Sequence, residues 1–305
     1  MKFSFIYLIL LYVIFPLGNI FAQDSKNVFT YKVGDIEVTL LVETSSERDT
    51  SMIIADNAMI QKYIPDGKVF LSINTFLVKT SKNTIMVDTG FGATIFETLK
   101  TLNIDASKID TVLITHMHGD HISGLMKDGK ATFSNANIYI SEQEKNYWAD
   151  TKLMAAAPEG RQSNFKLAQN ALAIYGNKVK TFKPGELNSK LKELLPGIAP
   201  AATFGHTPGH TAYIVSSGKD KLIILGDVIN IMNIQIPAPD IATVFDIDPK
   251  EAAKTRHKVL KYAAENKIPI AGMHLAYPAM GTLDSQSDGG FKFNQVKNEG
   301  NTPLK

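Results

Sequence analysis

Thr115-His116-Met117-His118-Gly119-Asp120-His121 is the stretch that decides the fold of this chain. An apolar run, residues 112–114, precedes it, so a buried strand is expected to end there in a loop. His116 and His118 are two residues apart, so on extended backbone their side chains leave one face and can converge on one cation. Asp120 and His121 can turn toward a second cation. The stretch therefore predicts an active site that binds metal.

Such a site needs ligands from other segments. A catalytic zinc ion takes three protein ligands and keeps an open position, and two adjacent metal ions need a bridging group. Three later residues, His206, Asp227 and His274, each follow a strand-like segment. An α/β scaffold collects functional groups on one rim in this way. We therefore expect these residues to complete the site.

With these residues in order, the chain resembles the metallo-β-lactamase superfamily, whose signature is H-x-H-x-D-H followed by a later His, Asp and His. The resemblance runs from about Asp88 to His274. Residues 205–211 and 225–227 are most similar to the branch that holds methyl parathion hydrolases and acyl-homoserine lactone lactonases, and residues 271–278 lean toward the former. The resemblance implies an α/β protein with an αβ/βα sandwich: two packed mixed sheets flanked by helices, with metals at one edge.

The resemblance also implies a role for each ligand. The first divalent metal ion is expected at His116, His118 and His206. The second is expected at Asp120, His121 and His274, and Asp227 bridges the two, which we expect to be Zn²⁺. A metal-bridging hydroxide attacks a carbonyl or phosphoryl centre, while Asp120 orients it or relays its proton, so Asp120 and Asp227 are the expected catalytic carboxylates. The predicted activity is hydrolysis of a small-molecule lactone, ester or phosphotriester by a metal-dependent enzyme.

Three other polar residues have supporting or surface roles in this interpretation. Asp88 either accepts a ring N–H from a ligand histidine or only ends a strand at a turn shaped by Gly90. His210, in a turn-forming stretch, is expected to hold the ligand loop by a hydrogen bond. His257 lies among charged residues of a helical run and is expected at the solvated surface.

The substrate is less well defined by the sequence. The lactonase branch places a tyrosine three residues after the bridging aspartate, where this chain has Asn230, which weakens a simple lactonase assignment. Trp148, the only tryptophan, either lines the pocket or packs in the core. Alternatives are a β-lactam or thioester hydrolase of the same fold, a mononuclear-iron dioxygenase, and a non-catalytic ligand-binding protein. A β-lactam is disfavoured because β-lactamases of this superfamily lack the carboxylate seen at Asp227.

The N-terminus has the sequence features of a secretory signal peptide. Residues 1–22 comprise Met1-Lys2, an apolar run and a small residue, Ala22, after which cleavage is expected. An uncleaved membrane anchor is the alternative, but the apolar core is short and is interrupted by Pro16 and Gly18. We therefore expect a periplasmic or secreted protein, with residues 23–305 forming a single metallo-β-lactamase-like hydrolase domain.

Composition limits the partners. The chain has 32 Lys plus Arg against 30 Asp plus Glu, which gives no electrostatic reason to expect nucleic acid or an anionic membrane. It has no cysteine, so neither a disulfide nor a thiolate ligand is available. The expected partner is a small-molecule substrate, and the oligomeric state stays open, a homodimer included.

Hydrophobic periodicity and turn residues predict the main elements. Strands are expected at residues 28–33, 36–42, 70–78, 84–87, 111–115, 138–140, 212–215 and 268–271. Helices are expected at residues 94–102, 162–175 and 249–264, with another beginning at a capping sequence, residues 141–144. Residues 51–63 are predicted to form a mobile excursion, and residues 281–305 a loop with one short strand at 291–293.

Overall fold

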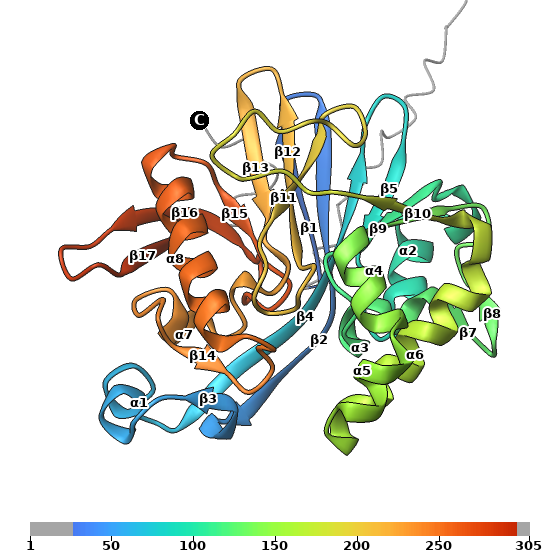
Figure 1. The fold of residues 1–305 in the computed structure, drawn as a ribbon. Helices are drawn as coiled ribbons and strands as arrows, with labels where there is room; N and C mark the ends of the chain where they lie inside the picture. The colour runs from blue at the N-terminus through green and yellow to red at the C-terminus, as the bar shows by residue number, and fades with distance from the viewer. Residues whose placement is uncertain (1–26, 298–305) are drawn as a thin grey trace, which may run out of the picture.

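Two mixed sheets pack face to face in the computed structural model, and helices cover their outer faces (Figure 1). The structure describes residues 27–297, so the predicted signal peptide, residues 1–22, lies outside the described residues. None of the described helices is long and apolar enough to cross a membrane. The layered arrangement confirms the predicted αβ/βα sandwich.

The first sheet has seven strands, antiparallel at one end and parallel at the other. In spatial order the strands are β1 (Val28–Val33), β2 (Ile36–Asp49), β4 (Lys68–Lys79), β5 (Thr84–Val87), β6 (Thr111–Leu113), β9 (Asn137–Ser141) and β10 (Val179–Phe182). Helices α2 (Ile95–Thr101), α4 (Glu142–Ala149), α5 (Thr151–Ala156) and α6 (Glu159–Tyr175) lie on the same side of the molecule as this sheet (Figure 1).

The second sheet has six strands and is antiparallel except where β13 pairs with β15. Its strands are β11 (Ile198–Ala202), β12 (Thr211–Ser217), β13 (Asp220–Ile224), β15 (Ile270–Ala271), β16 (Met280–Ser285) and β17 (Phe291–Gln295). Helix α8 (Pro249–Glu265) packs on it, and its buried residues recur at helical spacing from Ala252 to Ala263.

Alternating side chains of the first sheet contribute to two hydrophobic cores, one between the sheets and one under the helices. On β4, Phe76 and Val78 face the core between the sheets, whereas Leu77 faces the core under the helices. On β5, Val87 and Met86 divide in the same way. Because successive side chains of a strand point to opposite faces, a strand buried on both faces reads as a continuous apolar run. This explains why these strands were predictable from short apolar runs.

Two predictions about irregular segments were wrong. Residues 51–63 fold into η1 (Thr50–Met52), β3 (Ile53–Ile54) and α1 (Asn57–Tyr63), and β3 pairs with β14 (Ala242–Thr243). Residues 281–285 belong to strand β16, which pairs with β17 to extend the second sheet. In each segment only a few apolar side chains, such as Ile53 and Leu283, are buried, and their tertiary partners make that burial possible.

Candidate metal centre

The motif loop lies at the carboxyl ends of two parallel strands. Asp88 follows β5, and His116 and His118 follow β6 before the short helix α3 (Gly119–Ile122) begins. In the second sheet, Asp227 and His274 follow β13 and β15, which are also parallel. Carboxyl ends of parallel strands meet at one edge of a sheet, and the two edges face each other here. This explains how residues distant in sequence come together.

Three imidazole nitrogens of the first donor group face one point. His116 Nε2 lies 3.1 Å from His118 Nδ1, which lies 3.0 Å from His206 Nε2. Asp227 Oδ2 lies 3.3 Å from His206 Nε2 and 3.7 Å from His116 Nε2. Ligands about 2 Å from a tetrahedral zinc ion are separated by about 3.3 Å, which these spacings approach. The four side chains thus form one compact donor group.

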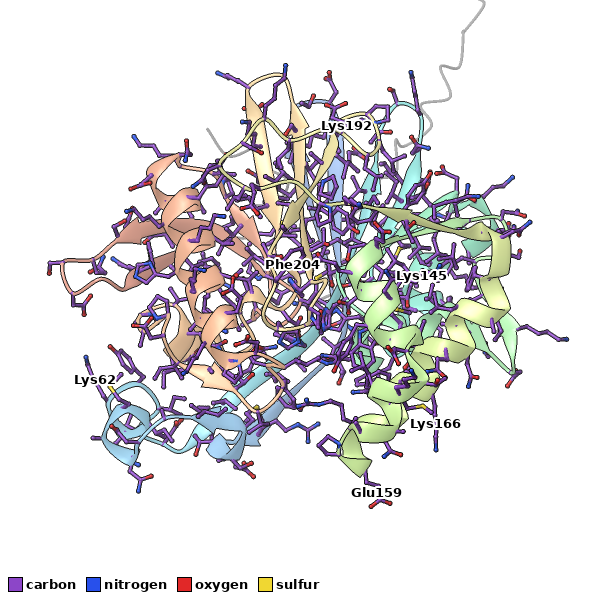
Figure 2. The ribbon with its side chains drawn as sticks, in the orientation of Figure 1. Lys62, Lys145, Glu159, Lys166, Lys192 and Phe204 are labelled. Atoms are coloured by element: carbon purple, nitrogen blue, oxygen red, sulfur yellow. The ribbon has the colours of Figure 1, made fainter. Side chains whose placement is uncertain are left out.

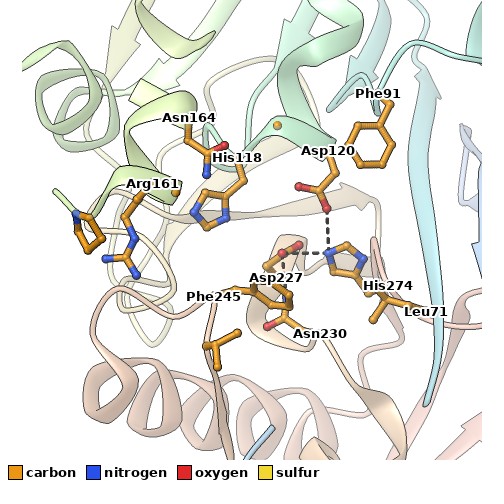
Figure 3. Close-up of a pocket in the computed structure, with 14 residues that line it drawn as sticks. Leu71, Phe91, His118, Asp120, Arg161, Asn164, Asp227, Asn230, Phe245 and His274 are labelled. Atoms are coloured by element: carbon orange, nitrogen blue, oxygen red, sulfur yellow. Dashed lines mark hydrogen bonds and ion pairs between the residues drawn. The ribbon is translucent and has the colours of Figure 1, made fainter. Parts of the chain in front are cut away.

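A second donor group adjoins the first through Asp227. Asp120 Oδ2 lies 3.6 Å from His121 Nε2 and 3.6 Å from His274 Nε2. Asp227 Oδ1 lies 3.1 Å from His121 Nε2, while its Oδ2 lies 3.0 Å from His274 Nε2. Figure 3 shows Asp120, Asp227 and His274 converging at the base of a pocket. Asp227 therefore contacts both groups, as a bridging carboxylate requires.

The donor set fits two divalent cations. Two of its buried atoms, His121 Nε2 and Asp227 Oδ1, have no hydrogen-bond partner in the described part of the chain. Leaving such atoms unsatisfied is unfavourable by about 1–3 kcal/mol each, so they are candidates for coordination. Imidazole nitrogens and carboxylate oxygens are also the ligands of catalytic divalent metals. The cluster could therefore hold two divalent metal ions.

The electrostatics of the site favour bound cations. Burial lowers the pKa of His118 to about 3 and holds that of His116 well below its ordinary value, so both rings are neutral and offer a lone pair. Burial also acts to lower the pKa of His121, but the charges of Asp227 and Asp120 overcome it and raise that pKa well above its ordinary value. The same carboxylates would stabilise a dication beside His121.

Asp88 orients one ligand histidine. Its Oδ2 lies 2.7 Å from His121 Nδ1, and its two oxygens accept hydrogen bonds from the backbone and hydroxyl of Thr115 at 2.8 and 2.6 Å. Asp88 itself has a left-handed backbone, with φ of 56°, as has the following Gly90, with φ of 62°. Of the two roles that the sequence left open, the structure shows the contact with the histidine ring, and Asp88 makes it from within the strand-ending turn.

Asp246 orients a second ligand histidine and was missed in the sequence. Its Oδ1 lies 2.8 Å from His206 Nδ1, and its Oδ2 accepts the Thr243 amide at 3.0 Å. Burial raises the pKa of Asp246, but its contacts with His206 and the buried Arg256 hold the pKa below its ordinary value, so it stays ionised. A carboxylate that binds the outer ring nitrogen fixes the tautomer and direction of a ligand.

Glu144 joins the two loops of the first donor group and was also missed. Its carboxylate accepts hydrogen bonds from the amide of Met117, between the two motif histidines, and from the amide of Gly209, at 2.9 Å each. The Thr207 hydroxyl and the Trp148 indole N–H donate to it at 2.7 and 2.6 Å. Burial raises the pKa of Glu144, and these four donors oppose that effect.

His210 and His257 differ in how they match their predictions. His210 Nε2 accepts the backbone N–H of Asp227 at 2.9 Å, which confirms the expected loop-holding hydrogen bond. Gly226 must lack a side chain here, because a Cβ would lie 2.6 Å from the same nitrogen. His257 is not a fully solvated residue, since it is partly buried and its ring packs edge-on against Phe291.

Trp148 is a core residue that also borders the site. It is fully buried and packs against Phe165, with ring centroids 4.7 Å apart. It also borders the donor groups, since the His118 ring lies 5.6 Å away between centroids. Trp148 does not line the pocket, so core packing is the correct one of its two predicted roles.

A pocket of about 520 Å³ opens above the donor groups. His118, Asp120, Asp227 and His274 lie at its base, and its walls come from both halves of the molecule (Figure 3). Asn230, the residue at the expected tyrosine position, donates from Nδ2 to Asp227 Oδ2 at 2.8 Å. Its amide thus holds the bridging carboxylate. The volume suits a small-molecule substrate.

The family sequence model of the Metallo-beta-lactamase superfamily matches residues 69–267, and the chain therefore belongs to this superfamily. The solved hydrolase AbOPH of the beta-lactamase superfamily is 29% identical, with a TM-score of 0.79 over 90% of this chain and 98% of that one. AidC, a dizinc quorum-quenching lactonase solved with a product, is 27% identical, with a TM-score of 0.80 over 89% of this chain and 98% of that one. These findings confirm the predicted branch and support a metal-dependent hydrolase.

Curated relatives match over shorter stretches. The uncharacterized protein YobT of Bacillus subtilis is 24% identical over 162 residues, which cover 51% of this chain and 61% of YobT. The exodeoxyribonuclease WalJ of Streptococcus pneumoniae is 33% identical over 79 residues, which cover 24% of this chain and 29% of WalJ. The chain thus spans about three fifths of the first relative and less than a third of the second.

Proposed function

We propose that the protein hydrolyses a small lactone, ester or phosphotriester with two divalent metal ions, most simply Zn²⁺. The observation that carries the proposal is the complete donor set in two groups that share Asp227 at the base of the pocket. His116, His118 and His206 would hold one ion, and Asp120, His121 and His274 the other. AbOPH and AidC, a hydrolase and a dizinc lactonase, support the reaction class.

When bound, the two ions supply Lewis acidity that polarises the substrate and lowers the pKa of water. The protein's own groups hold the reactants and move the proton. Asp120 has the more accessible carboxylate, with 23% of its side chain exposed against 3% for Asp227. It can accept the proton of the attacking water and pass it to the departing oxygen, so that an ester and water give an acid and an alcohol.

In this mechanism Asp227 and Asn230 hold the site in place and do not transfer protons. Both carboxylate oxygens of Asp227 face ring nitrogens, and Asn230 adds a hydrogen bond to one of them. Two donor groups favour a two-metal hydrolase over the alternative with a single iron. All seven predicted ligand positions carry a His or Asp side chain, and these side chains come together in the structure. A complete donor set favours an enzyme over a non-catalytic binding protein.

The test is hydrolysis by the mature protein against lactones, phosphotriesters, aryl esters and β-lactams. Zn, Mn or Co should support turnover, dialysis against a chelator should abolish it, and metal should restore it. Metal analysis of the active sample should give about two ions per chain. Full activity in a verified metal-free sample contradicts the proposal, and one iron per chain with oxygen consumption establishes the dioxygenase alternative.

We further propose that the protein is exported, with residues 23–305 as the mature single-domain chain. The signal-peptide grammar of residues 1–22 supports this. The mature protein should be recovered from the periplasm or medium with an N-terminus near Gln23. An intact Met1 in the cytosol, found by N-terminal sequencing after fractionation, contradicts export and leaves the metal centre unaffected.

A further inference from the structure

The two walls of the pocket differ in chemistry. Arg161 and Asn164, both on α6, lie on one side of the donor groups (Figure 3). Phe91 and Leu71 lie on the other side, and Phe245 lies below (Figure 3). A substrate that reaches the donor groups therefore lies between a polar wall and an apolar wall.

The apolar wall is unusually open to solvent. Three residues that line it are large and exposed: Phe91 at 51%, Val244 at 50% and Phe245 at 41%. Exposed apolar side chains that gather at one concave place indicate a binding surface, because a ligand can remove them from water. This wall would receive the apolar part of a substrate.

Arg161 on the opposite wall has no carboxylate partner among the described residues. No ion pair joins it to an acidic side chain within 4.0 Å, whereas the buried Arg256 is paired with Asp246. Among the described residues, Asp120 and Asp227 are the only acidic ones that line the pocket, and both belong to the metal donor set. Apart from the histidines of that set, the guanidinium is thus the one cationic side chain of the described pocket wall.

Tyr147 and Asn164 are polar neighbours of Arg161. Its charge acts on the Tyr147 hydroxyl, where it opposes the effect of burial on the tyrosine pKa. Asn164 lies on the next turn of α6, so its amide shares the face of the helix with the guanidinium and adds donor and acceptor groups. A tyrosine hydroxyl occupies at most one of the five guanidinium N–H donors, and the remaining ones match a carboxylate.

We propose that Arg161, with Asn164, is a specificity-determining site for a carboxylate on the substrate. The substrate class is an ester or lactone that carries an anionic group on one side of the scissile bond and an apolar group on the other. This inference rests on the proposed hydrolase function and narrows it. A neutral ester would still reach the donor groups but would leave the polar wall without a partner.

The test compares matched pairs of esters. The 4-nitrophenyl monoesters of succinic, glutaric and adipic acids carry a carboxylate at three distances from the scissile bond, and methyl capping makes a neutral partner of each. The metal-loaded protein should favour the anionic member of at least one pair in kcat/KM, mainly through KM. A charge-assisted hydrogen bond predicts a preference of roughly 10- to 100-fold.

The variants separate Arg161 from the general charge of the site. Arg161→Gln should reduce the anionic-to-neutral ratio by about tenfold or more, and Arg161→Lys should restore part of it. Lys166→Gln is the matched control, since Lys166 is an exposed cation of the same helix outside the pocket (Figure 2), and it should keep the ratio. Calorimetric binding of the dicarboxylate products should weaken in Arg161→Gln in parallel, which gives a readout independent of turnover.

The outcomes are distinguishable. If the metal-loaded protein hydrolyses none of the esters and none of the wider substrate panel, the proposed hydrolase function fails. If it hydrolyses anionic and neutral members equally, or if Arg161→Gln and Lys166→Gln change the ratio alike, hydrolysis stands and the role of Arg161 is overturned. Circular dichroism and thermal unfolding of each variant show whether a loss of preference comes from a folded protein.

Discussion

At the scale of single residues, Asp227 has the most contacts within the metal centre. Its two oxygens face histidines of both donor groups, its backbone N–H is held by His210, and Asn230 binds its carboxylate. A residue held from so many directions is fixed before any ligand arrives. Such preorganisation is what lets a bridging group set the distance between two sites.

Asp227→Ala should therefore lose the two-metal site, while His210→Ala should keep it. Water replaces a bridging carboxylate less well than it replaces an outer hydrogen bond. Elemental analysis of the purified variants measures the difference. If both retain about two metal ions per chain, as an intact two-metal site would, the assignment of Asp227 is wrong.

Asp246→Ala should weaken metal binding without removing a ligand. His206 loses the carboxylate that fixes its tautomer and ring direction, and such a change lowers metal affinity by about 10- to 100-fold. Competition with a chromophoric chelator gives the affinity. Asp240→Ala is the control, because Asp240 is an exposed aspartate of the same segment outside the pocket, and it should behave as the wild type.

The seven proposed ligands were predictable from sequence because four lie in one short motif and the others follow strand-like runs. Asp246 and Glu144 were not predictable. Asp246 contacts a histidine 40 positions away, and Glu144 contacts Thr207 from 63 positions away. Glu144 also matches a local helix-capping pattern, and Ser141 does accept its amide N–H. That pattern alone accounts for a glutamate at this position, so the sequence offered no reason to expect its contacts with the two ligand loops.

At the scale of elements, α4 connects the two ligand loops to the rest of the fold. Glu144 brings its carboxylate from this helix to Met117 in one loop and Gly209 in the other. The approach is close, since a Cβ on Gly209 would lie 2.1 Å from the Glu144 nitrogen. The loops that hold the first donor group are therefore fixed to α4 as well as to their own strands.

Glu144→Gln should destabilise the metal-free protein by about 2–4 kcal/mol, because an amide nitrogen replaces an acceptor that faces buried donors. Glu142→Gln, on the same helix, should change stability by less than about 0.5 kcal/mol, since its contact with Lys183 is a surface ion pair. Urea unfolding of both variants measures this. Equal effects in the two variants would show that Glu144 has no special role in joining the loops.

The elements that sequence analysis predicted correctly are those whose own residues carry the pattern. Strands β4 and β5 are buried on both faces, and α8 has an apolar stripe that begins after an aspartate cap and Pro249. By contrast, β3 consists of two residues and exists through its pairing with β14, almost two hundred positions away in sequence. No local periodicity encodes such a pairing.

At the scale of the whole molecule, the metal centre lies between the two sheets. The first sheet provides the motif residues, and the second provides His206, Asp227 and His274. A bound ion would therefore connect the two halves of the sandwich. Ligands that bind only the folded state increase its stability by mass action.

Zinc should accordingly raise the thermal unfolding temperature of the wild-type protein. At a free concentration about 1,000 times the dissociation constant, one site contributes about 4 kcal/mol. Scanning calorimetry with and without metal measures the shift, and Asp227→Ala should show a much smaller one. A wild-type unfolding temperature that is unchanged by saturating zinc would contradict binding across the two sheets.

The order of the donors along the chain has a consequence for how the protein is made. A ribosome releases the motif residues 115–121 well before Asp227 and His274. During that interval the nascent chain exposes half of a cation site without the sheet that completes it. His274 follows β15, whose neighbours β16 and β17 are synthesised later still. Binding of metal ions at the complete donor set would thus be a late event of biogenesis, because it requires both halves of the chain to be synthesised and assembled.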